Sequence, residues 1–325
     1  MNILVTGGAG YIGSHAVKML IEAGHGVTVV DNLSKGCRDA VHPAVEFHEA
    51  DIADTATMTQ ILRDSRIEGI MHFAALIEVG ESVREPLRYY DNNTGGTIRL
   101  LRAASAAGVG KFVFSSTAAV YGEPEVTPIT ETCATAPINP YGVSKWFTER
   151  VLADYAEAAP GFAYSIFRYF NVAGASPDGS LGERHDPESH LIPIVLQAAV
   201  GKRSQIAVYG TDYPTPDGTC IRDYIHVEDL CDAHIRVMER LGEGDRRVYN
   251  LGIGHGYSVQ EVLESAERVV GHPIPTVYGD RRPGDPARLY ADSALAQREL
   301  GWAPRHTDLD EIIGTAWNFF RRRWQ

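Results

Sequence analysis

Short runs of β-branched and other apolar residues alternate with longer amphipathic stretches through the first half of the chain. The runs that predict strands are Ile3–Val5, Val27–Val30, Val45–His48, Ile70–Phe73, Phe112–Ser115 and Tyr164–Phe167. Helical spacing of apolar residues follows at Ile12–Ala23, at Met58–Arg63 and at Leu87–Ala107, which Pro86 opens at a favoured first position. Nearly continuous apolar strands separated by helices are typical of a parallel sheet covered on both faces. We therefore expect an α/β fold with a doubly wound parallel sheet.

The texture of the sequence changes after about residue 172, where glycine, proline, aspartate and serine become crowded. Long loops, which often bind ligands, are expected at Gly174–Ser189, Gly210–Thr219 and Arg281–Pro286. Later helices are predicted at Leu191–Val200, Val227–Leu241, Ser258–Val270 and Asp308–Arg323. We expect a first domain over residues 1–172, to which the chain can return around residues 220–250, and a smaller α/β domain over residues 173–325. Because no low-complexity linker separates them, the two domains should pack closely around a cleft.

Composition and charge narrow the classes of partner. The 325 residues include 42 acidic and 30 basic side chains, and the net charge of −12 disfavours a nucleic-acid or anionic-membrane binder. No apolar run approaches the roughly 20 residues of a membrane helix, and Met1–Thr6 lacks the basic region of a signal peptide. The four cysteines have no CxxC spacing, and the 12 histidines show no metal-ligand spacing. We expect a soluble cytoplasmic protein with reduced thiols and without a metal site.

The segment Gly7-Gly8-Ala9-Gly10-Tyr11-Ile12-Gly13 joins the first predicted strand to the first predicted helix. Glycines suit a tight turn whose backbone approaches a pyrophosphate closely, and the helix N-terminus offers free N–H groups to that anion. A glycine turn without a ligand is the plainer alternative, but Asp31 ends the next strand, eighteen residues after Gly13. An acidic side chain there accepts hydrogen bonds from adenosine ribose hydroxyls and repels a 2′-phosphate. The combination predicts a Rossmann-type dinucleotide site that binds NAD rather than NADP.

Two later strand ends extend this predicted cofactor site. Asp51 follows the third strand, where it could reach the adenine or could instead cap the next helix. Phe73, Ala74 and Ala75 end the fourth strand, and small residues there let a dinucleotide lie across the strand ends at the switch point of the sheet.

Candidate catalytic groups follow the fifth strand. Tyr141 and Lys145 stand four residues apart, which places a phenol and an ammonium on one helix face. A free tyrosine has a pKa of about 10 and is a poor base, but nearby positive charge favours its phenolate. Thr117 at the carboxyl edge of the sheet could hydrogen-bond a hydroxyl that is being oxidised or relay its proton, or its own hydroxyl could simply be satisfied by backbone. The set predicts hydride chemistry at a substrate hydroxyl.

Together, the glycine loop, Asp31, Ser115-Ser116-Thr117, and Tyr141 with Lys145 resemble the extended short-chain dehydrogenase/reductase superfamily. Finer matches, which resemble the UDP-glucose 4-epimerase family within it, are Val79-Gly80-Glu81-Ser82, Tyr90-Asp91-Asn92-Asn93, Arg168-Tyr169-Phe170-Asn171, His190-Leu191-Ile192-Pro193, Asp212-Tyr213-Pro214-Thr215, Asp217-Gly218-Thr219 and Arg222-Asp223-Tyr224-Ile225-His226-Val227. The resemblance covers nearly the whole chain.

The resemblance implies a mechanism and a set of contacts. Tyr141 would take the proton of the sugar 4-hydroxyl with help from Thr117, C4 would give hydride to tightly held NAD, and the 4-keto sugar would turn over and recover it. Lys145 would hold the nicotinamide ribose and lower the pKa of Tyr141. NAD contacts are implied at Asn32, Asp51, Ile52, Phe73, Ala74, Ala75, Asn92 and Phe170. UDP-sugar contacts are implied at Asn171, His190, Leu191, Tyr209, Arg222, Arg282, Asp285 and Leu289, with the two arginines on the diphosphate.

The sequence departs from the family pattern at three positions. Ile77 stands where many of these epimerases have a lysine beside the cofactor phosphates, which puts the strength of NAD retention in question. His190 replaces an amide residue and could still pair with uracil or the pocket wall. Leu289 aligns with a position that gates larger 2-acetamido sugars, and its bulk predicts a preference for glucose and galactose.

Three rival functions can be compared. A nucleotide-sugar 4,6-dehydratase needs an acid–base pair directly after Thr117, where this chain has Ala118 and Ala119. An epimerase of UDP-uronates or UDP-pentoses has the same catalytic set and stays open. A non-catalytic NAD-sensing protein would not need both Tyr141 and Lys145. The resemblance also implies a homodimer packed through helices that flank the sheet.

Overall fold

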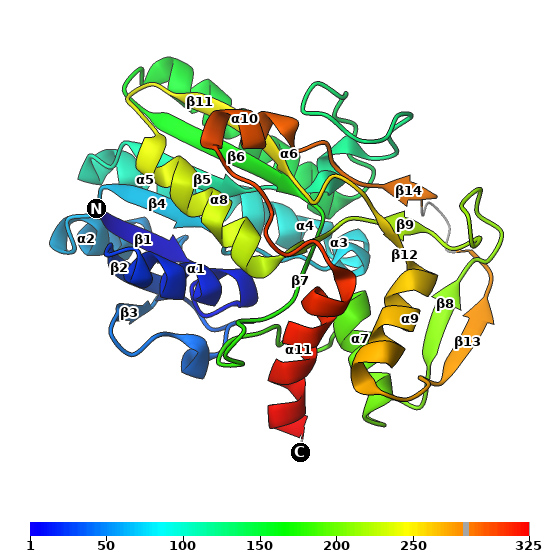
Figure 1. Ribbon diagram of the computed structural model, residues 1–325. Helices are drawn as coiled ribbons and strands as arrows, with labels where there is room; N and C mark the ends of the chain where they lie inside the picture. Colours follow the sequence, from blue (N-terminus) through cyan, green and yellow to red (C-terminus); the bar gives the residue numbers. More distant parts are fainter. Residues whose placement is uncertain (282–285, 325) are drawn as a thin grey trace.

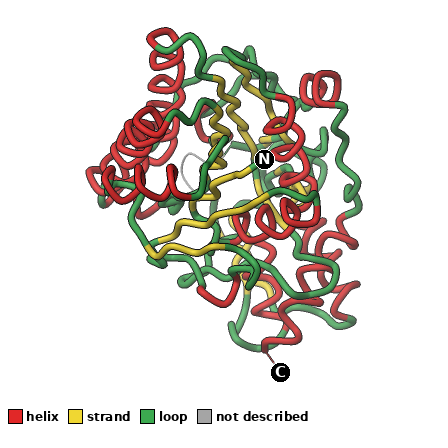
Figure 2. The backbone as a smooth tube through the Cα atoms, turned by 90° about the vertical axis from the view of Figure 1, so that its left-hand side faces the viewer, coloured by secondary structure: helices red, strands yellow, loops and turns green. Residues whose placement is uncertain are grey.

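The computed structural model describes residues 1–281 and 286–324. Its centre is a parallel sheet of seven strands: β1 (Asn2–Thr6), β2 (Gly26–Asp31), β3 (Glu46–Glu49), β4 (Gly69–His72), β5 (Lys111–Ser115), β6 (Ala163–Tyr169) and β11 (Arg246–Leu251). The strand order is β11-β6-β5-β4-β1-β2-β3, so the order reverses between β1 and β4. The six predicted strands are confirmed with ends shifted by at most two residues. The expected doubly wound α/β fold is also confirmed (Figures 1 and 2).

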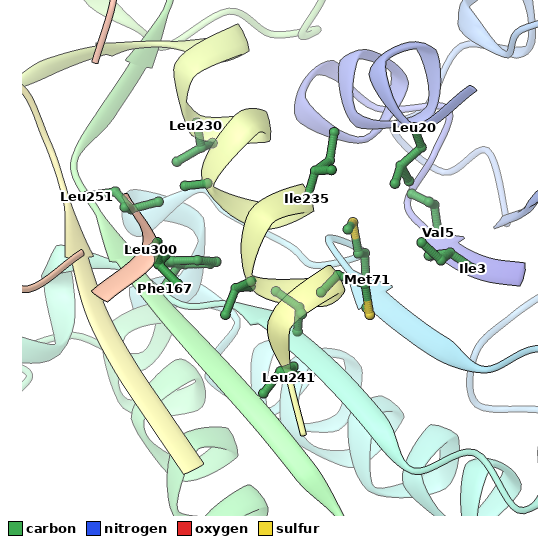
Figure 3. Close-up of a cluster of buried hydrophobic side chains, with 14 of the residues drawn as sticks. Ile3, Val5, Leu20, Met71, Phe167, Leu230, Ile235, Leu241, Leu251 and Leu300 are labelled. Atoms are coloured by element: carbon green, nitrogen blue, oxygen red, sulfur yellow. The ribbon is translucent and has the colours of Figure 1, made fainter. Parts of the chain in front are cut away.

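Helices cover both faces of this sheet because each presents one apolar stripe to it. One face carries α1 (Tyr11–Glu22), α8 (Val227–Arg240) and α10 (Ala294–Leu300), and the other carries α2 (Thr55–Asp64), α5 (Gly96–Ala107) and α6 (Pro140–Ala158). Figure 3 shows α8 in the first of these two cores, where Ile235 lies near Leu20 of α1 and Met71 of β4. In the second core, Leu62 of α2 packs with Leu101 of α5 and Leu152 of α6.

The last strand of the sheet comes from late in the sequence. After α8 the chain returns along β11, which pairs in parallel with β6, for example Val248 with Ile166. This strand was not predicted, because Arg246 and Arg247 open it and hide its apolar pattern. The elements α8, β11 and α10 therefore belong to the sheet and its cover although they follow residue 172.

A third core lies below the sheet in Figure 1, around α7 (Leu191–Ala199), α9 (Val259–Val270) and α11 (Leu309–Trp324). The strands β8 (Ile206–Tyr209) and β13 (Thr276–Gly279) pair beside these helices. Short strands join the two parts: β7 (Asn171–Ala173), β9 (Ile221–Arg222), β10 (Tyr224–His226), β12 (Tyr257–Ser258) and β14 (Arg288–Leu289). Across the residues that the structure describes, no helix is both long and apolar enough to traverse a bilayer.

The stretch predicted as one helix over Leu87–Ala107 is interrupted. It consists of α4 (Pro86–Tyr89), a π-helical turn at Tyr90–Gly95 and α5, and α3 (Val79–Arg84) precedes it. The buried Asn93 lies in the π turn, where its Oδ1 accepts from Leu76 N at 2.9 Å and its Nδ2 donates to Ser144 Oγ at 3.0 Å. These bonds tie the wide turn to α6 and to the segment after β4, and such turns are common at functional sites.

Candidate active site

The carboxyl ends of the central strands open into a cleft of about 450 Å³. Nearly all of the predicted site residues line it: Gly7, Gly10, Tyr11, Ile12, Gly13, Asp31, Asn32, Asp51, Ile52, Phe73, Ala74, Ala75, Asn92, Thr117, Tyr141, Lys145, Phe170, Asn171, His190, Arg222 and Leu289. Arg282 and Asp285 fall outside the residues that the structure describes. Ligands of α/β sheets bind where the strand order reverses, and this cleft lies there.

Two of the predicted substrate residues do not line the cleft. Leu191 is the first residue of α7 and packs against the third core. Tyr209 ends β8 opposite Gly279 and is 40% exposed. The family resemblance implied a substrate contact for each of them, but Leu191 packs in the core around α7 and Tyr209 lies in the pairing of β8 with β13.

The glycine loop fits closely between β1 and β4. Gly7 has φ +75°, and a Cβ there would lie 2.6 Å from Ala74 N, while a Cβ at Gly13 would overlap Gly7 O. These two glycines are thus required by the packing of the turn itself. At Gly10 the helix α1 begins with no side-chain cap, so the N–H groups of its first turn face the cleft. An uncapped N-terminus of a twelve-residue helix fits an anionic pyrophosphate.

Asp31 is fixed at the end of β2 by two backbone amides. Its Oδ2 accepts from Ala9 N at 3.0 Å and its Oδ1 from Leu33 N at 2.8 Å, and burial raises the pKa of the carboxyl. A carboxylate held in this way keeps lone pairs for ribose hydroxyls.

Asp51 does not cap the helix that follows it, which was one of its two predicted roles. Its carboxylate accepts from Ala53 N at 2.8 Å and from Asn32 Nδ2 at 3.2 Å. The cap of α2 is Asp54, which accepts from Thr57 N at 3.1 Å. The helix-cap interpretation of Asp51 is therefore wrong, and the side chain lines the cleft beside Asn32.

The helix α6 positions the predicted phenol and ammonium. Pro140 occupies its first turn, and Asn139 caps it by accepting from Gly142 N at 2.9 Å. One turn later, Lys145 Nζ donates to Ser115 O at 2.8 Å and lies 4.9 Å from the centre of the Phe114 ring. Burial lowers the pKa of Lys145 to about 7.

Tyr141 and Thr117 lie together in the cleft. Burial raises the pKa of Tyr141 to about 12, and the hydrogen bond with Thr117 acts in the opposite direction. Thr117 Oγ1 also accepts from Ala119 N at 3.1 Å and caps the 3₁₀ turn Ala118–Tyr121. The hydroxyl therefore contacts both backbone and phenol. In the protein alone, burial outweighs this hydrogen bond, and the lowering of the Tyr141 pKa expected from positive charge when NAD is bound stays a prediction.

A buried ion pair between Glu149 and Arg168 joins α6 to β6, and sequence reasoning missed it. Glu149, one turn after Lys145, accepts from Arg168 Nε at 3.0 Å and Nη2 at 2.6 Å, and also from the Ser116 hydroxyl. Arg168 Nη1 donates to Tyr121 Oη at 3.0 Å. The sequence signal for this pair was a glutamate on the same helix face as Lys145, four residues later, together with an arginine near the end of the apolar strand β6.

The opposite wall of the cleft is formed by short strands and loops. Arg222 of β9 and Leu289 of β14 are paired in register. Asn171 of β7 donates to Asp223 O at 3.3 Å through Nδ2. His190 precedes α7, and its Nδ1 lies 2.7 Å from Glu183 Oε1. Sequence reasoning also missed Glu183, although acidic and imidazole side chains alternate in the segment that contains it.

Comparison with known proteins agrees with this geometry. The NAD dependent epimerase/dehydratase family matches residues 3–252. The UDP-glucose 4-epimerase of Lacticaseibacillus casei is 51% identical over 320 residues, which are 98% of this chain and 96% of that protein. A crystal structure of a UDP-glucose 4-epimerase has a TM-score of 0.97 at 49% identity, covering 100% of this chain and 99% of the other.

A further solved structure bears on the ligands. The UDP-glucose-4-epimerase of Stenotrophomonas maltophila, solved with bound NAD and formylated UDP-arabinopyranose, has a TM-score of 0.96 at 41% identity. The match covers 100% of this chain and 99% of that one. The chain therefore belongs to the NAD dependent epimerase/dehydratase family and, within it, to the UDP-glucose 4-epimerases, which are NAD-dependent isomerases.

Proposed function

We propose that Tyr141 is the base that takes the proton of the sugar 4-hydroxyl when UDP-galactose and UDP-glucose are interconverted. The observation that carries this proposal is the meeting of Tyr141, Thr117 and Lys145 in the same cleft as the glycine loop. When bound, NAD supplies the oxidant that takes hydride from C4 and returns it to the other face. Because burial holds the Tyr141 pKa near 12, the phenol needs a positive charge beside it to act near neutral pH.

Thr117 and Lys145 position this base. Thr117 already contacts the phenol and can accept or relay the proton of the substrate hydroxyl. A lysine ammonium has three N–H donors, and Ser115 O accepts one, which leaves two for the ribose hydroxyls of the cofactor.

The remaining cleft residues divide into a cofactor set and a substrate set. For NAD, we propose the α1 N-terminus at the pyrophosphate, Asp31 at the adenosine ribose, and contacts from Asn32, Asp51, Ile52, Phe73, Ala74, Ala75, Asn92 and Phe170. For the UDP-sugar, we propose Arg222 at the diphosphate, where a guanidinium fork suits phosphate oxygens, with Asn171, His190 and Leu289 around it. Leu191, Tyr209, Arg282 and Asp285 stay predictions of the family resemblance.

The residues after Thr117 argue against dehydration of the same keto intermediate. Ala118 and Ala119 have no proton to donate or accept, and both line the cleft. A pentose substrate has a specific observation in its favour, because the Stenotrophomonas maltophila relative was solved with a modified UDP-arabinopyranose. UDP-pentose epimerisation is therefore the second candidate, ahead of UDP-uronates.

The deciding experiment is to give the purified protein UDP-galactose with no added cofactor and to assay UDP-glucose. Product would support both the reaction and retention of NAD through purification. Product that appears only after NAD is added would support the reaction with weak retention of NAD, as the family resemblance implies for a chain with Ile77 in place of a lysine in the cleft. If neither condition gives product but UDP-arabinopyranose is converted, the pentose alternative holds.

We also propose that the protein is a homodimer in the cytoplasm. Val83 of α3, Leu87 of α4 and Phe147 of α6 are exposed by 62%, 80% and 44%, and Tyr90 packs against the Phe147 ring. Apolar side chains gathered on helices that flank the sheet suit a second copy of the chain. The four cysteines are free thiols, as expected in a reducing compartment. Light scattering of the native protein, with Leu87→Asp as the disrupting variant, tests the dimer.

A further inference from the structure

Four side chains converge at the cleft, and only His190 among them belongs to the substrate set proposed above. Glu183, His185, Glu188 and His190 come from one eight-residue segment that leads into α7. Glu183 Oε1 lies 2.7 Å from His190 Nδ1 and 3.0 Å from His185 Nδ1. Glu188 Oε1 lies 3.4 Å and 3.9 Å from the same two nitrogens. One candidate ligand atom from each residue lies within 4.8 Å of all the others.

Ion-pair contacts bring the four groups together, but their geometry leaves polar atoms unsatisfied. Both Nδ1 atoms are buried from solvent, and neither forms a hydrogen bond of acceptable geometry despite its short distance to oxygen. The two carboxylates are also buried, with 4% of Glu183 and 8% of Glu188 exposed. Buried polar atoms without partners are rare in folded proteins, and an ion between them is one of the accepted explanations.

We propose that Glu183, His185, Glu188 and His190 bind a zinc ion. Two imidazole nitrogens and two carboxylate oxygens make a four-coordinate set of the type that zinc accepts, whereas calcium and magnesium prefer sites made of oxygen alone. Ligands about 2.0–2.2 Å from a tetrahedral centre lie about 3.4 Å from each other, and the four distances above surround that value. Two carboxylates with two neutral imidazoles also balance the charge of a divalent ion.

The backbone orients one of these ligands in advance. Glu188 Oε1 accepts from Ser189 N at 2.8 Å and from His190 N at 2.9 Å, which fixes the carboxylate toward the other three groups. Bonds of this kind, which orient a ligand from behind, are typical of metal sites.

The ion would fasten a loop and leave the sugar chemistry to the groups described above. Four protein ligands fill a tetrahedral zinc and leave no position for substrate. The same segment is bonded to the loops that follow β2 and β4. Arg184 pairs with Asp39 at 2.8 Å, and Ser189 Oγ donates to Glu78 at 3.1 Å. Since Glu183, Arg184 and His185 line the cleft, zinc would hold this wall of the cleft in place.

A second group in the described part of the chain provides a matched control. His226, Glu228 and His306 also bring three ligand atoms within 4.8 Å of one another. Their nitrogens, however, have protein partners: His226 Nε2 lies 3.2 Å from Thr315 Oγ1, His226 Nδ1 accepts from Glu228 N, and His306 Nδ1 lies 2.7 Å from Glu311. We expect no metal at this second group.

The test is metal content, measured without reference to turnover. The protein purified without chelators, or dialysed against micromolar Zn²⁺ after chelation, should hold about one zinc per chain by mass spectrometry of the metal. Co²⁺ in its place should give the strong visible absorption of a tetrahedral centre. Saturating Zn²⁺ should raise the Tm of the chelated protein by about 4 °C or more, whereas Mg²⁺ and Ca²⁺ should not.

Variants locate the ion. Glu183→Gln and His185→Ala should each reduce zinc affinity at least tenfold, while His306→Ala should bind zinc like the parent. If either variant fails to fold, the zinc and cobalt measurements on the parent protein still decide the question. Less than about one-tenth of an equivalent of zinc, or equal loss in His306→Ala, would overturn the proposal and leave four groups held only as imidazolium–carboxylate pairs.

Discussion

The cleft has two walls that are built in different ways. The cofactor wall consists of the glycine loop, the carboxyl ends of the central strands and α6, and the substrate wall consists of the short strands and loops that carry Arg222, Leu289 and His190. On the cofactor wall, Asp31 ends a six-residue strand and Lys145 lies inside a nineteen-residue helix. On the substrate wall, Arg222 and Leu289 belong to strands of two residues each. In the proposed assignment, the two cofactor contacts Asp31 and Lys145 are therefore carried by long elements, while the two sugar-nucleotide contacts Arg222 and Leu289 are carried by short ones. Specificity can then change without disturbing the chemistry.

The two walls also differ in what holds them. The cofactor wall rests on two continuous apolar cores and on the buried pair of Glu149 and Arg168. The substrate wall depends on side-chain bonds between segments far apart in the chain, such as Arg184 with Asp39. Each wall should therefore respond to mutation in its own way, and four substitutions test that difference.

The largest effect is expected at the base on the cofactor wall. Tyr141→Phe removes the proton acceptor and should lower kcat by about 10²–10⁴-fold, while UDP binds with nearly unchanged affinity. Steady-state kinetics and calorimetric titration with UDP measure the two quantities. Tyr155→Phe, on the same helix and packed against Phe162, is the control and should keep full turnover. Near-normal turnover of the Tyr141→Phe variant would mean that another group removes the proton.

The next effect concerns the stability of that wall. Arg168→Met leaves the buried Glu149 carboxylate without its partner and should lower the free energy of unfolding by about 3–5 kcal/mol. Arg150→Met breaks an exposed pair with Asp154 on the same helix and should cost less than about 1 kcal/mol. Urea unfolding of both variants measures the difference. Equal midpoints would show that the buried pair adds no more to stability than the exposed one.

The sequence predicted the strands of the cofactor wall, and which residues line it, because the patterns that mark them are local. Apolar runs marked β1, β2 and the strands that follow, and the glycine loop with Asp31 marked the nucleotide end. β11 escaped prediction because its place beside β6 depends on a contact between residues about eighty positions apart, across two arginines. The π turn at Tyr90–Gly95 escaped because the bonds of Asn93 to Leu76 and Ser144 form only in the folded protein.

The substrate wall was predicted through family resemblance, and physical reasoning added little there. Nothing in the local pattern around Arg222 or Leu289 indicates strands of two residues. The strand β14 forms by pairing with β9, and β9 lies between β14 and β12, which comes from a distant part of the chain. Tyr141 shows a different limit. Its position was predicted, but the extent to which burial raises its pKa was not, since the degree of burial depends on the whole cleft. The lowering of this pKa by positive charge when NAD is bound stays a prediction.

Substitution of Asp31 tests whether the preference for NAD over NADP depends on this single side chain. Asp31→Ala removes the negative charge that disfavours a 2′-phosphate, so the preference for NAD over NADP should fall by about ten- to a hundredfold. Binding of each cofactor to stripped protein measures the ratio. Asp31→Asn separates charge from packing, because the amide oxygen can still accept from one of the two amides that Asp31 now binds, Ala9 N and Leu33 N. An unchanged ratio in both variants would place cofactor selection elsewhere.

The smallest effect is expected on the substrate wall, where a single side chain should alter specificity alone. Leu289 lies in a two-residue strand and lines the cleft, so a smaller residue there changes space without touching Tyr141 or Lys145. Leu289→Ser should raise kcat/KM for UDP-N-acetylglucosamine by roughly tenfold and leave UDP-galactose within a factor of about two. Leu289→Ala distinguishes lost volume from an added hydroxyl. If neither variant gains activity on the acetamido sugar, or if both lose activity on UDP-galactose, then the substrate wall is as strongly coupled to the chemistry as the cofactor wall.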